Sequence, residues 1–246
     1  NRTMKAKKSL GQNFLKSEIA LRKIVEAGEI KPDDTILEIG PGRGALTKQL
    51  LACSCQLIAV EKDKNLYELL KDKFQKEILS NQLKLVHDDI LNFKIESYKL
   101  PAKTYKLIAN IPYNITGAIL KKFLTEKKQP ELMVLMVQHE VAQRILARDR
   151  KESILSISVK AYGEPKMIMK VDKRYFSPAP KVNSAVISIK NISRKIFTSP
   201  QPSPYKVEGG KAPVPDKTWN SQTFEEKFWE IVKTGFAHKR KKLSSN

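Results

Sequence analysis

Short apolar runs alternate with amphipathic runs through the first 140 residues of the chain. The apolar runs have the length of buried strands, and they occupy residues 35–40, 56–63, 83–90, 105–111 and 131–138. Between them, residues 44–53 and 64–79 place apolar side chains three and four positions apart, which predicts helices. The repeated strand–helix–strand order predicts a mostly parallel sheet with helices on both faces, that is, a doubly wound α/β fold.

The pattern changes after residue 150. Three closely spaced apolar runs, at 153–163, 166–176 and 183–190, predict strands that join the same sheet in antiparallel orientation. Residues 194–217 are rich in Pro, Gly, Ser and Lys, which predicts a linker or a long exposed loop. A helix is expected after this segment, and its apolar face would consist of Phe224, Phe228, Trp229 and Val232.

We therefore expect a large α/β domain over residues 1–193, a linker over 194–217 and the start of a small helical domain over 218–246. Because the sequence stops soon after the last predicted helix, we expect this helical domain to be truncated. No apolar stretch approaches the ~18 residues of a membrane-spanning helix. The basic N-terminus lacks the apolar core of a secretory signal, so a cytoplasmic location is expected.

The composition indicates a polyanionic partner. Lysine and arginine number 46 against 26 acidic residues, which gives a formal net charge of +20. A charge of this size is typical of proteins that bind nucleic acid or an anionic membrane, and the lack of a basic helix with a bulky apolar face favours nucleic acid. Two cysteines, Cys53 and Cys55, and three scattered histidines do not form a ligand set, so no metal site is predicted.

A glycine-rich turn follows the first predicted strand, in the sequence EIGPGRGALT (38–47). Gly40, Gly42 and Gly44 allow the backbone to turn tightly and to approach a ligand closely before a helix begins. Glu61, at the end of the next strand, can accept hydrogen bonds from both hydroxyls of a ribose. The combination predicts an adenosine-containing cofactor, and the turn itself fits NAD and S-adenosylmethionine (SAM) equally well.

The sequence Asn110-Ile111-Pro112-Tyr113 ends the fourth predicted strand. Pro112 cannot donate to a sheet, so the strand stops where the carboxyl ends of parallel strands line a ligand cleft. The Asn110 side-chain carbonyl and the backbone carbonyl of Ile111 or Pro112 can accept the two hydrogens of an exocyclic adenine amine. This arrangement would turn the nitrogen lone pair toward a sulfonium methyl, while Tyr113 stacks on the base. We expect positioning to supply much of the catalysis.

Two further positions could face the same cleft. Asp88 or Asp89, after the third strand, could accept a hydrogen bond from an adenine amino group, although acidic residues at strand ends also serve as helix caps. Phe176 opens the rigid segment FSPAP. If this segment lies over the cleft, Phe176 and Tyr113 would sandwich a base that has left its stack. An aromatic residue before a proline otherwise belongs to the core.

Five motifs, in order along the chain, carry a family resemblance. KKSLGQNFL (7–15), EIGPGRGALT (38–47), VEKD (60–63), NIPYNITGAIL (110–120) and FSPAPKVNSAVI (176–187) resemble those of the KsgA-type small-subunit enzymes of the ribosomal RNA adenine N-6 methyltransferase family. The resemblance implies a Rossmann-like class I methyltransferase that uses SAM. It implies dimethylation of the N6 amines of two adjacent adenines in the 3′-terminal hairpin of small-subunit (16S) rRNA, late in small-subunit biogenesis.

The resemblance also assigns roles to individual residues. The cofactor-contacting positions are Asn13, Leu15, Gly40, Glu61, Asp89 and Asn110. The base-stacking positions are Tyr113 and Phe176. The implied partner is the immature small ribosomal subunit, with no membrane and with a monomeric enzyme. In the family a C-terminal helical domain contributes to rRNA binding, so its truncation is expected to weaken docking. The segment SPQPSPYKVEGGKAPVP (199–215) has no counterpart in the family pattern.

Three alternatives remain at this stage. The erythromycin-resistance methyltransferases share the QNF, glycine-turn and NIPY sequences but modify one adenine of large-subunit rRNA. Some relatives are non-catalytic assembly or transcription factors, although the intact Asn110–Tyr113 motif and glycine turn argue against lost activity. An NAD-dependent oxidoreductase would fit the glycine turn and leave both NIPY and the positive charge unexplained.

Overall fold

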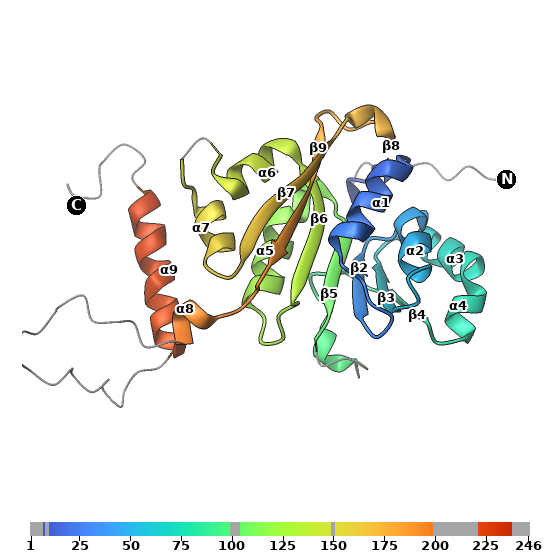
Figure 1. The fold of residues 1–246 in the computed structure, drawn as a ribbon, viewed down its shortest axis with the longest axis horizontal. Coiled ribbons are helices and arrows are strands. Elements are labelled where there is room, and N and C mark those ends of the chain that lie inside the picture. The colour runs from blue at the N-terminus through green and yellow to red at the C-terminus, as the bar shows by residue number, and fades with distance from the viewer. Residues whose placement is uncertain (1–6, 8–9, 99–103, 149–150, 199–220, 238–246) are drawn as a thin grey trace, which may run out of the picture.

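The structure is a computed structural model that describes residues 7, 10–98, 104–148, 151–198 and 221–237. Its centre is a seven-stranded sheet with the strand order β4-β3-β2-β5-β6-β9-β7 (Figure 1). The strands are β2 (Thr35–Ile39), β3 (Gln56–Glu61), β4 (Leu83–His87), β5 (Lys106–Asn110), β6 (Leu132–Gln138), β7 (Glu164–Val171) and β9 (Ser184–Lys190). A smaller sheet pairs β1 (Phe14–Leu15) with β8 (Phe176–Ser177).

The direction of the strands defines where a ligand can bind. Strands β2 to β6 run parallel to one another, whereas β9 is antiparallel to both of its neighbours, β6 and β7. The chain runs outward from β2 through β3 to β4, and then returns to β5 on the other side of β2. In doubly wound sheets, a ligand crevice forms at such a reversal, outside the carboxyl ends of the strands.

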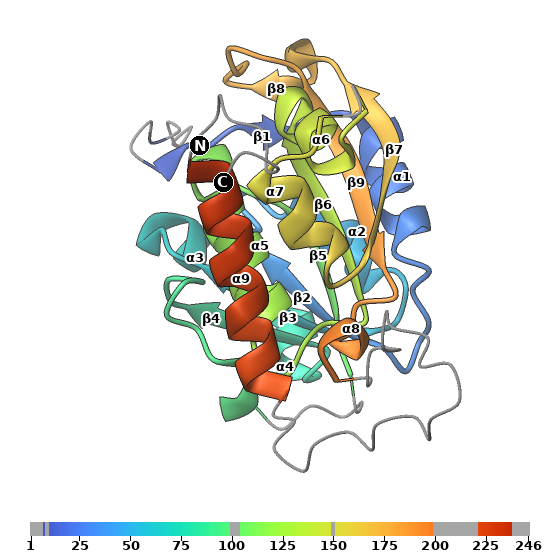
Figure 2. The same ribbon diagram turned by 90° about the vertical axis from the view of Figure 1, so that its left-hand side faces the viewer.

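Helices cover both faces of the sheet, and each face has its own hydrophobic core (Figures 1 and 2). One face carries α1 (Glu18–Ala27), α2 (Ala45–Leu51), α3 (Lys64–Lys73) and α4 (Gln75–Leu79). The other carries α5 (Thr116–Thr125), α6 (His139–Leu146), α7 (Ile154–Lys160), α8 (Lys195–Thr198) and α9 (Ser221–Ala237). Adjacent strand residues enter opposite cores, since Leu37 joins the core under α5 and Ile36 joins the core under α1. The predicted doubly wound α/β fold is confirmed.

The five parallel strands predicted from apolar runs are confirmed as β2 to β6. Within the predicted run 44–53, Ala45–Leu51 form α2. The helical run 64–79 is interrupted at Phe74, where the backbone leaves the helical region (φ −114°, ψ 33°) between α3 and α4. The later runs at 166–176 and 183–190 supply β7 and β9, and these are antiparallel to each other as expected.

The strand prediction for residues 153–163 is wrong, because these residues form helix α7. The Ser153 side chain accepts a hydrogen bond from the backbone N–H of Ser156, and the Ser156 side chain accepts one from the backbone N–H of Ser153. This reciprocal capping box satisfies N–H groups that are otherwise left without partners at a helix start. The local cap therefore decides the conformation of a segment whose alternating polarity is typical of a strand.

The C-terminal helix α9 packs on the α7–α8 side of the domain (Figure 2). The Phe228 ring lies 5.4 Å from the buried ring of Phe197, and the Trp229 ring stacks on Tyr162 at 6.1 Å between centroids. Residues 195–198, at the start of the predicted linker, form α8. Residues 199–217 of that linker, and residues 218–220 and 238–246 of the predicted helical domain, lie outside the described residues.

The reversed direction of β9 determines where the β7–β9 connection lies. Val171 at the end of β7 and Gln138 at the end of β6 both pair with Ser184, the first residue of β9. Residues 172–183 therefore lie at the sheet edge where the parallel strands end. Within this connection, β8 pairs with β1, so the N-terminal segment (residues 10–16) is brought to the same edge.

Candidate active site

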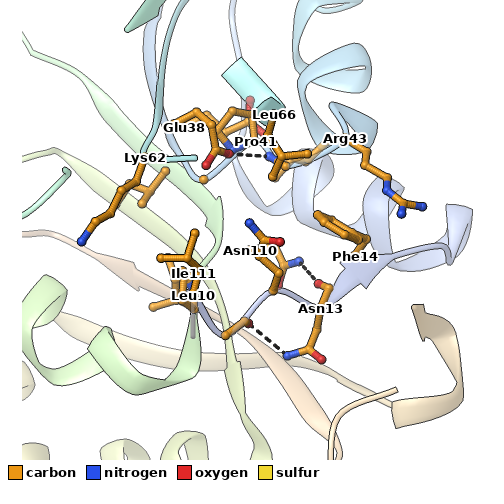
Figure 3. Close-up of a pocket in the computed structure, with 18 of the residues that line it drawn as sticks. Leu10, Asn13, Phe14, Glu38, Pro41, Arg43, Lys62, Leu66, Asn110 and Ile111 are labelled. Carbon is orange, nitrogen blue, oxygen red and sulfur yellow. Dashed lines mark hydrogen bonds between the residues drawn. The ribbon is translucent and has the colours of Figure 1, made fainter. Parts of the chain in front are cut away.

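A cavity of about 480 Å³ lies at the carboxyl ends of β2, β3 and β5 (Figure 3). Its walls come from the N-terminal segment, the glycine turn, the ends of β3 and β4, and the NIPY sequence after β5. This is the crevice at which the winding of the sheet reverses. The volume falls in the range of small-molecule and cofactor sites, about 300–1,000 Å³.

The glycines of the turn are needed for different structural reasons. Gly40, Gly42 and Gly44 all have left-handed backbone conformations, with φ of 62°, 61° and 76°. A Cβ on Gly44 would lie 2.5 Å from the Phe74 ring, so close helix packing requires a glycine there. A Cβ on Gly40 would meet no protein atom within 4 Å, and Gly40 lines the cavity. The turn therefore leaves open space at Gly40 for a ligand.

Glu61 presents a buried carboxylate to the cavity. Its Oε2 accepts a hydrogen bond from the backbone N–H of Gly42 (3.1 Å), and its Oε1 accepts one from the backbone N–H of Asp63 (2.8 Å). Burial raises the pKa of Glu61, and these two backbone hydrogen bonds oppose the rise. Each oxygen keeps a lone pair, so the carboxylate can still accept from two ribose hydroxyls, which fits the predicted cofactor role.

Glu38 is a second buried carboxyl in the cavity wall, and its Oε2 has no hydrogen-bond partner among the described residues. Burial raises its pKa to about 8, the nearby Glu61 adds to the rise, and Thr47 opposes it. Figure 3 shows Glu38 on the side of the cavity away from Asn110 and Asn13. The Glu38 carboxyl group is therefore largely protonated at neutral pH, where it can donate a hydrogen bond.

The ligand-free protein is expected to lose stability as the pH rises between about 4.5, the ordinary pKa of a glutamate, and about 8. In this interval the folded protein binds the Glu38 proton more tightly than the unfolded chain does, so unfolding becomes easier as pH increases. The loss is at most about 1.4 kcal/mol per pH unit. Urea unfolding of wild type and Glu38→Gln across this interval measures it, and equal slopes for the two proteins would contradict the prediction.

The N-terminal segment is tied to the end of β3. Asp63 accepts hydrogen bonds from the side chains of Lys7 and Gln12, each at 3.0 Å, and also caps α3 through the N–H of Asn65. The sequence motifs contain these residues, but their spacing along the chain gives no sign that they meet. Asp63 therefore links the N-terminal segment, which forms one wall of the cavity, to the end of the strand that carries Glu61.

Asn110 lies at the centre of the site. Its Nδ2 donates to the backbone carbonyl of Asn13 at 3.3 Å, and the Asn13 side chain in turn donates to the carbonyl of Gly11 (Figure 3). Because a carbonyl must face the NH₂ end of the amide, Oδ1 is the atom left to accept from a ligand. The predicted acceptor is thereby positioned, and Asn13 acts through its backbone.

Pro112 and Tyr113 line the cavity beside Asn110. The Pro112 carbonyl already accepts a long hydrogen bond from the Ile115 N–H (3.3 Å), and a carbonyl has a second lone pair for a ligand. The Tyr113 hydroxyl shares a hydrogen bond with Ser184 of β9, and burial raises the pKa of Tyr113. Ser184, which the sequence did not single out, thus fixes the position of a ring predicted to stack on a base.

Of the remaining predicted residues, some line the cavity and one does not. Leu15 and Asp89 line the cavity, as does Asp88, but the Asp89 carboxylate forms an ion pair with Lys62 at 2.7 Å, and this pair lowers the pKa of Asp89. Phe176 is not part of the cavity wall. Its side chain is 2% exposed and lies in the core beneath β1, whereas its neighbour Ser177 reaches the cavity. The structure therefore does not bring Phe176 opposite Tyr113.

Within the described residues, no group of three or more His, Cys, Asp and Glu side chains could hold a metal ion. The described helices are also too short or too polar to cross a membrane.

Comparison with known proteins decides the family. Residues 3–202 match the family model described as ribosomal RNA adenine dimethylase. The chain belongs to this family. Its members' activity makes it a SAM-dependent adenine dimethyltransferase of ribosomal RNA, which confirms the methyltransferase prediction and excludes the oxidoreductase alternative. The open space at Gly40, the paired acceptors of Glu61 and the oriented Asn110 amide fit SAM in the cavity.

Curated relatives and solved structures support the same family assignment. A protein of Dehalococcoides mccartyi named ribosomal RNA small subunit methyltransferase A is 39% identical over 98% of this chain and 74% of its own length. One of the same name from Fusobacterium nucleatum is 37% identical over 98% of this chain and 82% of its own.

A dimethyladenosine transferase from Plasmodium falciparum superposes with a TM-score of 0.75, at 26% identity, over 94% of this chain and 74% of that one. The 23S rRNA methyltransferase ErmE gives 0.64, at 30% identity, over 72% of this dimethylase and 69% of that chain.

Proposed function

We propose that this dimethylase modifies small-subunit rRNA, adding two methyl groups to N6 of each of two adjacent adenines in the 3′-terminal hairpin. We propose further that it acts as a monomer, in the cytoplasm, on immature small subunits. The names of the curated relatives support the small-subunit substrate, since they match over 98% of the chain. ErmE, whose name gives 23S rRNA as its substrate, is less similar, at 30% identity over 72% of the chain.

The observation that carries the proposed chemistry is the orientation of Asn110. With Nδ2 held by the Asn13 carbonyl, Oδ1 accepts one hydrogen of the adenine N6 amine, and the backbone carbonyl of Ile111 or Pro112 accepts the other. The amine lone pair then points away from both acceptors. Bound SAM supplies the electrophilic methyl group. When the nitrogen takes the methyl group, the S–CH₃ bond of SAM would break and leave a neutral thioether, and the alkylated nitrogen would then lose its proton to water. The residues therefore need to orient the amine rather than remove its proton first.

The aromatic and acidic residues have supporting roles in this proposal. Tyr113, fixed by Ser184, stacks on the target base, while Gly40, Gly42, Glu61, Leu15 and Asp89 hold the cofactor. For Phe176 to contact the base as well, its ring must leave the core in which it lies, and we propose this only for the RNA-bound state.

Incubation of the protein with labelled SAM and immature small subunits tests the proposal. We expect label in two adjacent dimethyladenines near the 3′ end of the small-subunit rRNA, located by mass spectrometry of nuclease fragments. Large subunits serve as the matched control. Label confined to large-subunit rRNA, or bound SAM with no transfer to either RNA, would contradict the proposed substrate.

A further inference from the structure

Among the described phenylalanine, tyrosine and tryptophan residues, only Tyr175 is exposed to solvent. Its side chain is 43% exposed, whereas the other described aromatic rings are buried or half-buried. It lies in the 3₁₀ turn Lys173–Tyr175, directly before β8. Folding gains little from an aromatic ring left in water, so an exposed ring beside a functional site is a candidate contact for a partner.

The position of Tyr175 is fixed by its backbone. Its carbonyl accepts a hydrogen bond from the N–H of Lys16 at 2.8 Å, and both Lys16 and Ser177 line the cofactor cavity. Tyr175 therefore lies at the rim of the cavity, on the side formed by β1 and β8. A molecule that places an adenine at Asn110 must extend outward from this edge of the sheet.

The 172–183 connection that carries Tyr175 has an excess of positive charge, and Arg174 also pairs with Asp172 (Nε to Oδ1, 3.6 Å). Arg174 lies over the Tyr175 ring, with its guanidinium carbon 5.6 Å from the ring centroid. Lys16, Lys173 and Lys181 are exposed, and Asp172 is the one acidic residue of the 172–183 connection. We call Lys16, Lys173, Arg174, Tyr175 and Lys181 the rim platform. An aromatic ring among cations is the combination that binds single-stranded nucleic acid, because the ring stacks on a base and the cations contact phosphates.

The platform is held rigidly. The N–H of Lys173 donates to the Asn183 side chain (3.0 Å), and the N–H groups of Arg174 and Tyr175 both donate to Asp172. Asn183 is itself held, because its carbonyl accepts from the N–H of His139 at the start of α6. A surface that is ordered before binding loses less conformational entropy when a partner docks.

We propose that the rim platform binds the RNA nucleotides that flank the target adenine, with Tyr175 stacking on one base and the lysines and Arg174 contacting the backbone. This inference rests on the proposed function and adds to it a surface outside the cavity. It explains how a positively charged protein aligns an extruded adenine with Asn110: the neighbouring bases are held at the rim while the target base enters the cavity.

The test compares Tyr175→Ala and Tyr175→Trp with wild type, using an RNA hairpin that carries two adjacent adenines in its loop. We expect Tyr175→Ala to weaken RNA binding by about tenfold, because a lost base–aromatic stack has an effect of this size. Tyr175→Trp should retain binding, since indole also stacks. The affinity for SAM and the melting temperature should match wild type, because the side chain is at the surface.

Charge is tested separately. Replacing Lys173 and Lys181 with glutamine should reduce the slope of log K against log salt by about 2, since about one unit is lost per phosphate contact. Lys31→Gln is the matched control, because Lys31 is exposed and precedes β2, at the opposite edge of the sheet. Lys31→Gln should reduce the slope of log K against log salt by less than replacement of either Lys173 or Lys181 alone does.

The RNA-binding measurement tests the rim platform even if no methyl group is transferred. Failure of the platform can therefore be told apart from failure of the proposed function. Unchanged RNA affinity in Tyr175→Ala would overturn the platform. So would a loss of binding that is seen with phosphatidylserine vesicles and not with RNA. Methyl transfer by wild type to the hairpin or to small subunits, with a raised KM in Tyr175→Ala and an unchanged kcat, would support both proposals.

Discussion

Replacing Asn110 with alanine is expected to lower kcat for methyl transfer by about 10²–10³-fold, the usual cost of removing one oriented polar contact to a reacting group. The variant loses the Oδ1 acceptor, and the target amine is no longer held with its lone pair outward. The affinity for SAM should fall by less than about tenfold, because the Gly40 turn and Glu61 remain. Single-turnover transfer of labelled methyl groups and calorimetric titration with SAM measure the two effects separately.

Asn110→Asp separates the two functions of the side chain. A carboxylate keeps an acceptor for the amine but cannot donate to the Asn13 carbonyl, which holds the amide in wild type. We expect transfer between that of wild type and that of Asn110→Ala. Turnover retained in Asn110→Ala would show that the amine is oriented by other groups.

Glu61→Gln is expected to raise the dissociation constant for SAM by about 10–100-fold, the equivalent of one or two hydrogen bonds to a charged group. Both Glu61 oxygens face backbone N–H donors, those of Gly42 and Asp63. Whichever way a glutamine amide is turned, its NH₂ group faces one of these donors, so the loop shifts or a donor loses its partner. The acceptor for one ribose hydroxyl is lost as well.

Glu68→Gln is the matched control for this change, because Glu68 is exposed on α3 and lies outside the cavity. Its affinity for SAM should equal that of wild type. If Glu61→Gln also binds SAM like wild type, the proposed ribose contact is wrong, and the carboxylate serves only to hold the glycine turn.

The fold could be predicted where burial determines the pattern of apolar and polar residues along the chain. Strands buried on both faces are continuous apolar runs, so β2, β3, β5 and β6 could be located from the sequence, and their alternation with helices implied the parallel sheet. Residues 153–163 were misassigned because serines alternate with apolar residues there. The Ser153–Ser156 capping box, a local interaction that alternation does not report, makes this segment helical.

The site was predictable where the chemistry lies at strand ends. Glu61 and Asn110 are the last residues of β3 and β5, two parallel strands that end at the same edge of the sheet, so their convergence follows from the topology. Contacts between distant segments could not be derived in this way. The burial of Phe176 beneath β1 and the Lys62–Asp89 ion pair depend on tertiary packing. Nothing in the sequence distinguishes Tyr175 from the other aromatic residues.

One piece of chain both closes the cavity and controls the Asn110 amide. The N-terminal segment forms a wall of the cavity, and its Asn13 carbonyl holds Nδ2 of Asn110. Movement of this segment away from the cavity breaks that hydrogen bond and leaves the amide free to rotate. The orientation of the Asn110 amide therefore depends on the same segment that forms a wall of the cofactor cavity, so a substitution that displaces this segment would impair both.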